Sequence, residues 1–350
     1  MSRVVMTCAL LLAGCSGNVT GDGADGGDPI AGGDAAAVAD AAPADARAPV
    51  HYQNPVLDQS CPDPGVLLVE EQATYYMVCT SGTYPIWQSA DLTAWTPTGA
   101  AIFPSGSRPA WARDPFWAPE IHRVGDHYVA YFTARVGPDG RLAIGAARAS
   151  SPLGPYEDIG APLVHDTSVS MIDASYLLAS DGRHYLFWKS NGNALDPQQP
   201  THLYGRELAA DGLSFAGATE DLLVNDLGWE ADVIEAPWVR EHDGDFFLFY
   251  AGNVFDERYR TGVARSTVGP LGPYAKRGNP ILGNNEFWVG PGHGSVVVGP
   301  MGDDVFVYHG RPAADPDSGR RVLADRIEWG ADGWPTIHDG TPSHGEVTWQ

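Results

Sequence analysis

Basic residues are scarce in this 350-residue chain, in which 21 Lys and Arg stand against 44 Asp and Glu for a formal net charge of −23. Nucleic acids and other polyanions are bound through Lys and Arg, so this charge argues against both classes of partner. Apolar residues at sustained helical spacing are also missing, which argues against a mainly helical fold. Turn-forming residues are plentiful instead, with 42 Gly and 28 Pro, as expected for many short strands.

Cysteine is rare as well, and two of the four cysteines lie in the first 15 residues. An early positive charge at Arg3 precedes the apolar residues 8–12. This pattern predicts a secretory signal peptide that is too short to span a bilayer. The run Leu12-Ala13-Gly14-Cys15 resembles the bacterial lipoprotein box, which implies cleavage before Cys15 and attachment of lipid to its thiol. A plain signal peptide with a chance cysteine is the alternative.

Residues 16–50 contain Gly, Ala, Asp and Pro but no aromatic residue. Such a segment cannot bury enough apolar surface to fold, so we expect a disordered tether. The tether would hold a folded domain of residues 51–350 away from the membrane, with the lipid anchor in the outer membrane or at the cell surface. Cys61 and Cys79 remain in this exported domain, where we favour a disulfide over two free thiols.

Five segments of the domain share one order: a short polar motif, an apolar strand, a turn and an aromatic strand. They span residues 63–78, 118–132, 173–188, 235–250 and 292–308. Their leading residues lie 53 to 62 positions apart, which leaves room for about four short strands in each repeat. The sequence therefore predicts an all-β, five-bladed β-propeller in one domain, with two β-sandwiches as the main rival.

Three of the five repeats begin with an acidic residue: Asp63, Asp173 or Glu235. The first strand of each propeller blade lines the central axis, so these carboxyl groups should converge at one mouth of the channel. Burying several carboxylates together is costly and raises at least one pKa, which is how an enzyme obtains an acid and a base at one pH. The alternative is that each acid only caps a turn.

The repeats resemble those of glycoside hydrolase family 43, five-bladed propellers that cleave arabinose- and xylose-containing polysaccharides. The match covers roughly residues 54–343, with Ala236 standing where many family members have Gly. The matching motifs are residues 54–56, 62–64, 89–95, 171–175, 234–237 and 332–335.

This resemblance implies a role for each of the three acids. Asp63 would be the general base that activates water, and Glu235 would be the general acid that protonates the departing glycosidic oxygen. Asp173 would orient Glu235 and adjust its pKa. The family inverts the anomeric carbon, for which the base and acid stand about 6.5–9.5 Å apart.

Further residues are candidates for binding substrate or an ion. His293 leads the fifth repeat, and its match to arabinan-cleaving members suggests that it faces the axis, where several relatives hold a calcium or similar ion. We expect no required cofactor, and any structural Ca²⁺ held mostly by water, because hard cations prefer oxygen ligands. The alternative is an axial histidine bonded to water or a carboxylate.

Phe116 or Trp117 would stack on the cleaved sugar, unless they are core aromatics between blades. Arg311 would bind sugar hydroxyls, or else form a surface salt bridge. Three residues are weaker candidates. Glu120 is a fourth axial acid, to which the family gives no catalytic role, and Trp87 and Trp288 would line the pocket wall.

The sequence thus predicts an exported, lipid-anchored inverting glycoside hydrolase of plant cell-wall polysaccharides, most simply an α-L-arabinofuranosidase acting on arabinan or arabinoxylan. A β-xylosidase or an endo-arabinanase of the same family would share the three acids. A surface lipoprotein that binds glycan without cleaving it is the rival from another class.

Overall fold

The computed structural model describes residues 49–349, and this part of the chain is almost entirely β-strand. The predicted signal peptide, Cys15 and nearly all of the predicted tether lie outside the described residues. The helical elements of residues 49–349 are four single 3₁₀ turns: Glu70–Gln72, Gly192–Ala194, Gly228–Glu230 and Pro316–Ser318. Among these residues, no helix has the length and apolar character that crossing a membrane requires.

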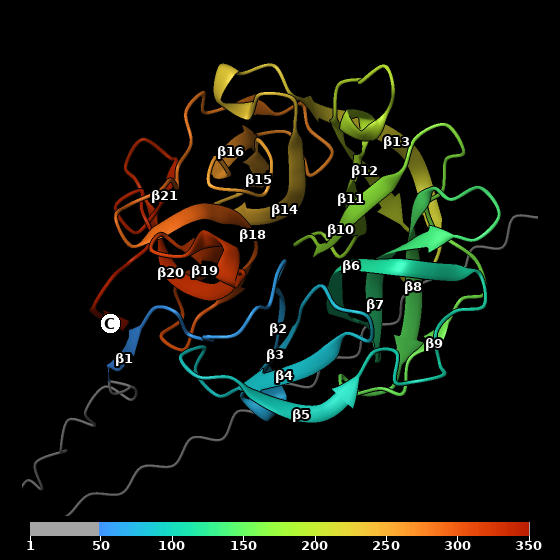
Figure 1. Ribbon diagram of the computed structural model, residues 1–350, viewed down its shortest axis with the longest axis horizontal. Coiled ribbons are helices and arrows are strands. Elements are labelled where there is room, and N and C mark those ends of the chain that lie inside the picture. The colour runs from blue at the N-terminus through green and yellow to red at the C-terminus, as the bar shows by residue number, and fades with distance from the viewer. Residues whose placement is uncertain (1–48, 350) are drawn as a thin grey trace, which may run out of the picture. The chain divides into compact units, whose positions relative to one another are not determined.

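Five four-stranded antiparallel sheets form in chain order and surround one axis (Figure 1). Blade 1 consists of β2 (Gly65–Val69), β3 (Thr74–Val78), β4 (Pro85–Ser89) and β5 (Thr96–Ala101). Blade 2 consists of β6 (Ala112–Val124), β7 (His127–Val136), β8 (Leu142–Ala149) and β9 (Glu157–Asp158). Blade 3 consists of β10 (Met171–Leu178), β11 (His184–Ser190), β12 (His202–Leu208) and β13 (Phe215–Val224).

The last two blades complete the ring. Blade 4 consists of β14 (Ile234–His242), β15 (Asp245–Gly252), β16 (Arg260–Ser266) and β17 (Ala275–Lys276). Blade 5 consists of β18 (Trp288–Val298), β19 (Asp304–Pro312), β20 (Arg321–Trp329) and β21 (Pro335–Ile337). The first strand of each blade is innermost and contacts the first strands of both neighbouring blades, blade 5 meeting blade 1. The predicted five-bladed β-propeller is confirmed.

Short turns explain why each repeat folds as a hairpin. Asp243 and Gly244 connect β14 to β15, and both have positive φ, 50° and 82°. This conformation at both central residues defines the two-residue turn whose twist suits antiparallel strands, and Asp-Gly favours it. In three further blades the turn between the first two strands carries a glycine with positive φ: Gly125, Gly182 and Gly302.

The hydrophobic core is divided into wedges between adjacent blades. One wedge joins blades 1 and 2 through aromatic residues that include Tyr84, Phe103 and Phe132. Similar buried clusters fill the other four blade interfaces. Because both faces of a blade are buried, strands such as β7 are apolar along most of their length, which hides the two-residue alternation of a half-exposed strand.

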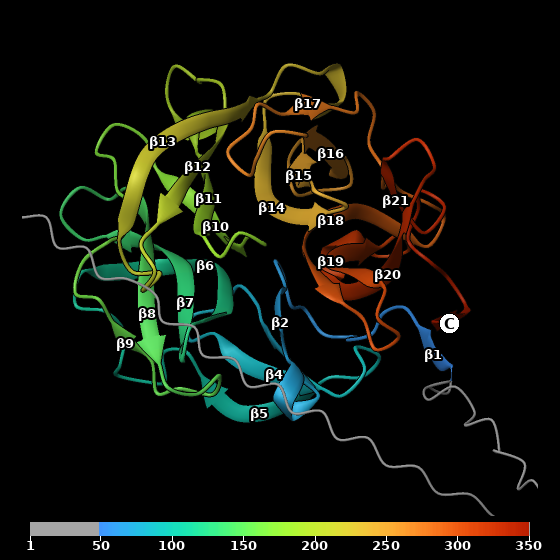
Figure 2. The ribbon, with the colours of Figure 1, turned by 180° about the vertical axis from the view of Figure 1, so that it is seen from behind.

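A separate two-stranded sheet joins the ends of the described chain. β1 (Val50–Gln53) pairs antiparallel with β22 (Glu346–Trp349), beside blade 5 (Figure 2). The chain then passes along blade 5, where Leu57 bridges Val322, before it enters blade 1. The first segment of the domain therefore holds blade 5 next to blade 1.

Candidate active site

A cavity of about 400 Å³ lies among the starting segments of the innermost strands. Its wall contains all three predicted catalytic acids, Asp63, Asp173 and Glu235, which come from blades 1, 3 and 4. The basic side chains of the wall are Lys189, His293 and Arg320. Carboxylates and cations are thus concentrated in one hollow that also has apolar walls.

A bulge near the start of the innermost strands sets the direction of these side chains. The pairing register of four of these strands shifts around one residue with positive φ: Ala118, Asp173, Ala236 or His293. Asp63 has the same conformation just before β2, with a φ of 56°. A β-bulge re-aims side chains, and proteins use it at active sites.

These bulges correct the alignment that the sequence analysis used. Glu235 is one residue before the bulge residue of blade 4, whereas Asp63 and Asp173 occupy the bulge positions of their own blades. Glu120 is two residues beyond the bulge residue of blade 2 and does not line the cavity. The extra residue of a bulge leaves no mark in the hydrophobic pattern, so the sequence could not supply this register.

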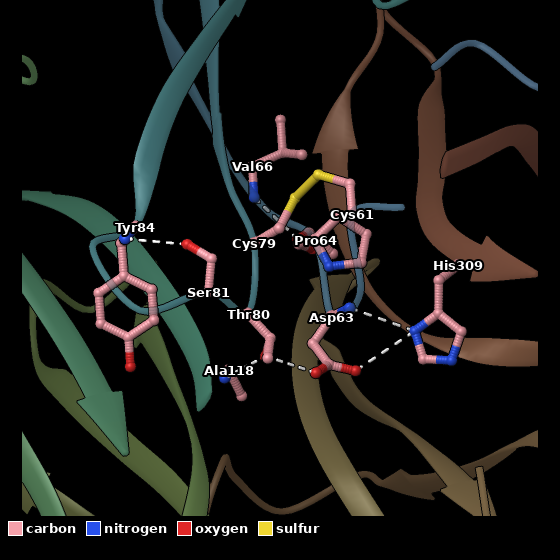
Figure 3. Close-up of a disulfide and its surroundings, with 11 residues drawn as sticks. Cys61, Asp63, Pro64, Val66, Cys79, Thr80, Ser81, Tyr84, Ala118 and His309 are labelled. Carbon is pink, nitrogen blue, oxygen red and sulfur yellow. Dashed lines mark hydrogen bonds and ion pairs between the residues drawn. A yellow bond between two sulfur atoms is a disulfide. The ribbon is translucent and has the colours of Figure 1, made fainter. Parts of the chain in front are cut away.

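Both carboxylate oxygens of Asp63 are engaged (Figure 3). Thr80 donates its hydroxyl to Oδ2 at 2.6 Å, and the backbone N–H of Ala118 in turn bonds Thr80 Oγ1 at 2.8 Å. Arg320 donates Nη1 to Oδ1 at 2.8 Å. Nδ1 of His293 lies 3.3 Å from the same oxygen.

A disulfide bond lies next to Asp63 and Thr80 in the sequence. Cys61 is bonded to Cys79, so it ties the segment before β2 to the end of β3 (Figure 3). Asp63 lies two residues after Cys61, and Thr80 directly follows Cys79. The covalent link therefore holds the two segments that carry the carboxylate and its hydroxyl donor, and the predicted pairing is present.

The electrostatic surroundings suit Asp63 to act as a base. Burial opposes its ionisation, but Arg320 and then His293 outweigh burial and hold the pKa of Asp63 well below its usual value. Burial lowers the pKa of His309 to about 3, so its ring is neutral. Nδ1 of His309 therefore accepts the backbone N–H of Asp63 at 3.2 Å and fixes the segment that carries the carboxylate.

Glu235 is buried to 8 % exposure, and both of its oxygens are also occupied. Tyr259 donates its hydroxyl to Oε1 at 2.7 Å, and Lys189 donates Nζ to Oε2 at 2.8 Å. Burial raises the pKa of Glu235, but Lys189 and then Tyr259 outweigh it, so the pKa lies below its usual value. In this arrangement Glu235 is ionised.

Asp173 lies beside Glu235, and its pKa is shifted in the opposite direction. Its Oδ2 accepts the backbone N–H of Ala236, the residue after Glu235, at 3.2 Å. Burial raises the pKa of Asp173 to about 6, with the negative charge of Glu235 acting in the same direction and His293 and Lys189 opposing it. Of the two carboxyl groups, Asp173 therefore holds a proton to higher pH than Glu235 does in the free protein.

Glu120 forms a buried pair on the axis, away from the cavity wall. Its Oε2 lies 2.6 Å from Nε2 of His122. Burial raises the pKa of Glu120 well above its usual value and lowers the pKa of His122 to about 3. The two groups therefore share a neutral hydrogen bond in the core.

The residues around His293 offer few protein ligands for a cation. Residues 49–349 contain no group of three His, Cys, Asp or Glu side chains that could hold a metal ion. The neighbouring oxygen of Asp63 already accepts Arg320, a fixed positive charge that disfavours a second cation. A Ca²⁺ ion held mostly by water beside His293 stays a prediction.

Of the predicted aromatic residues, one reaches the cavity. Trp117 lines its wall with 37 % of the residue exposed. Phe116 is 3 % exposed and belongs to the core between blades 1 and 2. Trp87 and Trp288 are likewise packed in cores between blades and do not line the cavity. Consecutive residues of a strand face opposite ways, which separates Phe116 from Trp117.

Arg311 does not contact the cavity. Its guanidinium donates to two backbone carbonyls, those of Pro316 at 2.8 Å and Phe255 at 3.1 Å. Arg320, nine residues later, lines the cavity and lies over the ring of Phe255 at 5.3 Å. Arg311 therefore supports the loop that carries Phe255. The arginine that lines the cavity is Arg320.

The sequence analysis missed Arg320, Lys189 and Tyr259. Lys189 carried a usable signal, because a charged residue directly after the apolar run 185–188 is unusual for a buried strand. Arg320 and Tyr259 lie in segments between strands, where no periodic pattern indicates direction.

The sequence profile of glycosyl hydrolases family 43 matches residues 52–335. The chain is 29 % identical over 252 residues to an extracellular exo-alpha-(1->5)-L-arabinofuranosidase of Streptomyces avermitilis; the match covers 66 % of this chain and 51 % of that protein. It is 28 % identical over 296 residues to the beta-D-galactofuranosidase xynD of Aspergillus niger, covering 78 % and 81 % of the two chains.

Solved structures agree with these sequence matches. The crystal structure of a thermostable family-43 glycoside hydrolase superposes with a TM-score of 0.76 at 32 % identity, covering 84 % of this chain and 98 % of that one. The profile match, the five-bladed fold and the acid-lined cavity agree, and the chain is a glycoside hydrolase that belongs to family 43.

Proposed function

We propose that the protein is an exo-acting, inverting glycoside hydrolase that releases α-L-arabinofuranose from plant arabinan or arabinoxylan. The observation that carries the proposal is that the acidic residues of one cavity have contrasting electrostatic surroundings. Asp63 is held ionised by Arg320. Asp173 and Glu235, on the other side of the cavity, have pKa values that are pushed apart. Such a separation assigns acid and base roles to titratable groups.

In the proposed mechanism, Asp63 removes a proton from water as the water attacks the anomeric carbon. Glu235 gives a proton to the departing glycosidic oxygen, and Asp173 orients Glu235 and exchanges a proton with it. Inversion needs about 6.5–9.5 Å between base and acid so that water fits between them. The positions of Asp63 and Glu235 on blades 1 and 4, which are not neighbours in the ring, are compatible with this separation.

The preference for a furanoside rests on the relatives. Three of them are named as exo-acting arabinofuranosidases and one as a galactofuranosidase. All of these names describe five-membered sugar rings, so a β-D-galactofuranoside is the second candidate substrate. In the proposed complex, Trp117 stacks on a sugar face and His293 donates to a hydroxyl. A β-xylosidase or endo-arabinanase would use the same three acids with other loops.

The proposal includes export and a lipid anchor on Cys15. The lipoprotein-box motif of residues 12–15 supports it, and three of the relatives are named as extracellular. Mass spectrometry of the amino-terminal peptide from a bacterial host would detect a diacylglyceryl group on Cys15. An unmodified thiol there would contradict the anchor and leave the hydrolase proposal intact.

The test is a substrate panel on a form of the protein that begins near Ala48. The panel contains aryl α-L-arabinofuranoside, aryl β-D-galactofuranoside, aryl β-D-xyloside and linear arabinan. We expect arabinose release, with kcat at least about 10³-fold lower for Asp63→Asn and Glu235→Gln, because each removes a proton-transfer group. Proton NMR of the first-formed sugar should show the inverted anomer.

Thr98→Val serves as the matched control, because the hydroxyl of Thr98 bonds only backbone groups of blade 1, the carbonyl of Ile86 and the N–H of Ala100, away from the cavity. It should retain wild-type turnover. Binding of arabino-oligosaccharide without turnover of any substrate would favour the rival, a surface lipoprotein that binds glycan. Release of xylose alone would correct the substrate class.

A further inference from the structure

Lys189 is a buried cation in direct contact with the proposed general acid. It lies near the end of β11, pairs with Ile172 of β10, and has 1 % of its side chain exposed. Its Nζ is 2.8 Å from Oε2 of Glu235. A lysine is almost never buried unless it is paired, so this side chain depends on a carboxylate at this place.

The contact conflicts with a simple proton donor. An ammonium group has three hydrogen-bond donors and no acceptor, so its bond to Oε2 is strongest when that oxygen carries no proton. The other oxygen, Oε1, accepts the hydroxyl of Tyr259 at 2.7 Å. The arrangement therefore fits an ionised Glu235, whereas general acid catalysis requires a proton on this residue before the glycosidic bond breaks.

Asp173 is the neighbouring group that can hold this proton. Its Oδ2 is fixed by the N–H of Ala236, directly beside Glu235 in the chain. Burial raises the pKa of Asp173 to about 6, and the charge of Lys189 acts on both carboxyl groups in the opposite direction. The other titratable groups that act on this pair are Asp63, Glu120, Tyr259 and His293.

We propose that Lys189 is a positioning residue for the catalytic proton: its ammonium group binds whichever of Asp173 and Glu235 is ionised, so that the two carboxyl groups together keep one proton. This inference rests on the proposed function. When a glycosidic oxygen approaches Oε2, it displaces Lys189, which turns to Asp173. The proton of Asp173 passes to Glu235, and Lys189 keeps all of its own protons.

The protons gained and lost by the protein balance over one turnover. Glu235 gives its proton to the leaving oxygen, and Asp63 takes one from the attacking water. Asp63 then returns that proton to solvent, and the carboxyl pair takes one up, so the starting state is restored. No redox partner is needed.

The inference is tested by the pH profile of kcat/KM. Removing the ammonium group in Lys189→Met raises the pKa of both carboxyl groups, because an adjacent cation favours their ionised forms. Asp173 and Glu235 then lose their last shared proton at a higher pH. The basic limb of the kcat/KM profile should therefore move up by about one pH unit. Lys189→Arg keeps a positive charge and should keep the limb near its wild-type position.

Lys276→Met is the matched control. Lys276 is a partly buried lysine of blade 4 whose Nζ lies 2.7 Å from the carboxylate of Glu230, and it does not line the cavity. Its loss should lower stability without moving the limb. A Lys189→Met profile with an unmoved basic limb would overturn the proposal, and so would a Lys189→Arg profile that moves as far as that of Lys189→Met.

A second measurement needs neither turnover nor a variant at Lys189. Carboxyl ¹³C NMR of the substrate-free protein, assigned with Asp173→Asn and Glu235→Gln, should show two well-separated protonation steps, one near pH 6. A single step shared by both groups would overturn the inference. If the wild type cleaves nothing in the substrate panel, the proposed function fails, and this titration still decides whether Asp173 and Glu235 together keep one proton.

Discussion

At the scale of single residues, Asp63 is fixed by partners that fall far apart in the sequence. Thr80 is 17 positions away from it, and Arg320 is 257 positions away. The hydroxyl of Thr80 and the guanidinium of Arg320 engage different oxygens of the carboxylate. Asp63 thereby keeps both its direction and its charge in a buried place, where an unpaired carboxylate would take up a proton.

Arg320→Met should move the acidic limb of the kcat/KM profile to higher pH. Arg320 is the largest of the charges that hold the pKa of Asp63 below its usual value, so its loss raises that pKa. In the proposed mechanism Asp63 acts in its ionised form, and a higher pKa of Asp63 means that activity is lost earlier as the pH falls. We expect a shift of about one pH unit.

Arg311→Met is the control for this measurement. Arg311 also lies in blade 5, but it bonds backbone carbonyls and does not contact Asp63. Its loss should change KM, through the loop of Phe255, and leave the acidic limb in place. Equal limb shifts in both variants would contradict the role given to Arg320.

At the scale of elements, four of the five innermost strands share a bulge with one residue in the left-handed region. In blades 3 and 5 this residue, Asp173 or His293, points its own side chain into the cavity. In blade 4 the bulge residue is Ala236, whose N–H binds Asp173, and the residue before it supplies the carboxylate. The same bulge thus places side chains of different lengths around the axis of the propeller.

Ala236→Gly should leave stability nearly unchanged. Alanine at a φ of 55° costs about 1–2 kcal/mol, and relief of this strain offsets the loss of one buried methyl group and the greater flexibility of glycine. Ala264→Gly in β16 removes a fully buried methyl group from ordinary strand backbone and should lower the free energy of unfolding by about 1–2 kcal/mol.

Urea denaturation followed by tryptophan fluorescence compares the two variants directly. Equal losses of stability in Ala236→Gly and Ala264→Gly would show that the bulge residue is not strained.

At the scale of the whole molecule, Asn54 closes the ring. It is 3 % exposed, and its amide donates to Ala324 O, Asp325 Oδ2 and Ser343 Oγ while its oxygen accepts the N–H of Ala324 at 2.9 Å. These partners belong to blade 5 and to the segment after it. The asparagine of the opening motif therefore joins the first segment of the domain to the last blade and does not reach the cavity.

Asn54→Ala should destabilise the propeller by about 2–4 kcal/mol, because it leaves several buried polar groups without partners. Gln53→Ala, at an exposed neighbouring position, should change stability by less than about 0.5 kcal/mol. Thermal and chemical unfolding of both variants checks the prediction. Equal midpoints would mean that Asn54 does not contribute to closure.

The sequence by itself determined the number of blades, the cysteine pair and the three acids of the cavity. Repeat length, turn residues and apolar strands are local properties, and they recur five times, so each blade supports the interpretation of the others. The motif residues of the resemblance identified Asp63, Asp173 and Glu235 because these motifs are contiguous in the chain.

Only the tertiary structure decided how these acids are supported. Lys189 meets Glu235 across 46 positions of sequence, and Arg320 rather than Arg311 meets Asp63. Such contacts depend on the bulge register and on the closing of the ring, which bring separate blades to one axis. A hydrophobic pattern records which side of a strand is buried, but it does not record which distant charge lies opposite.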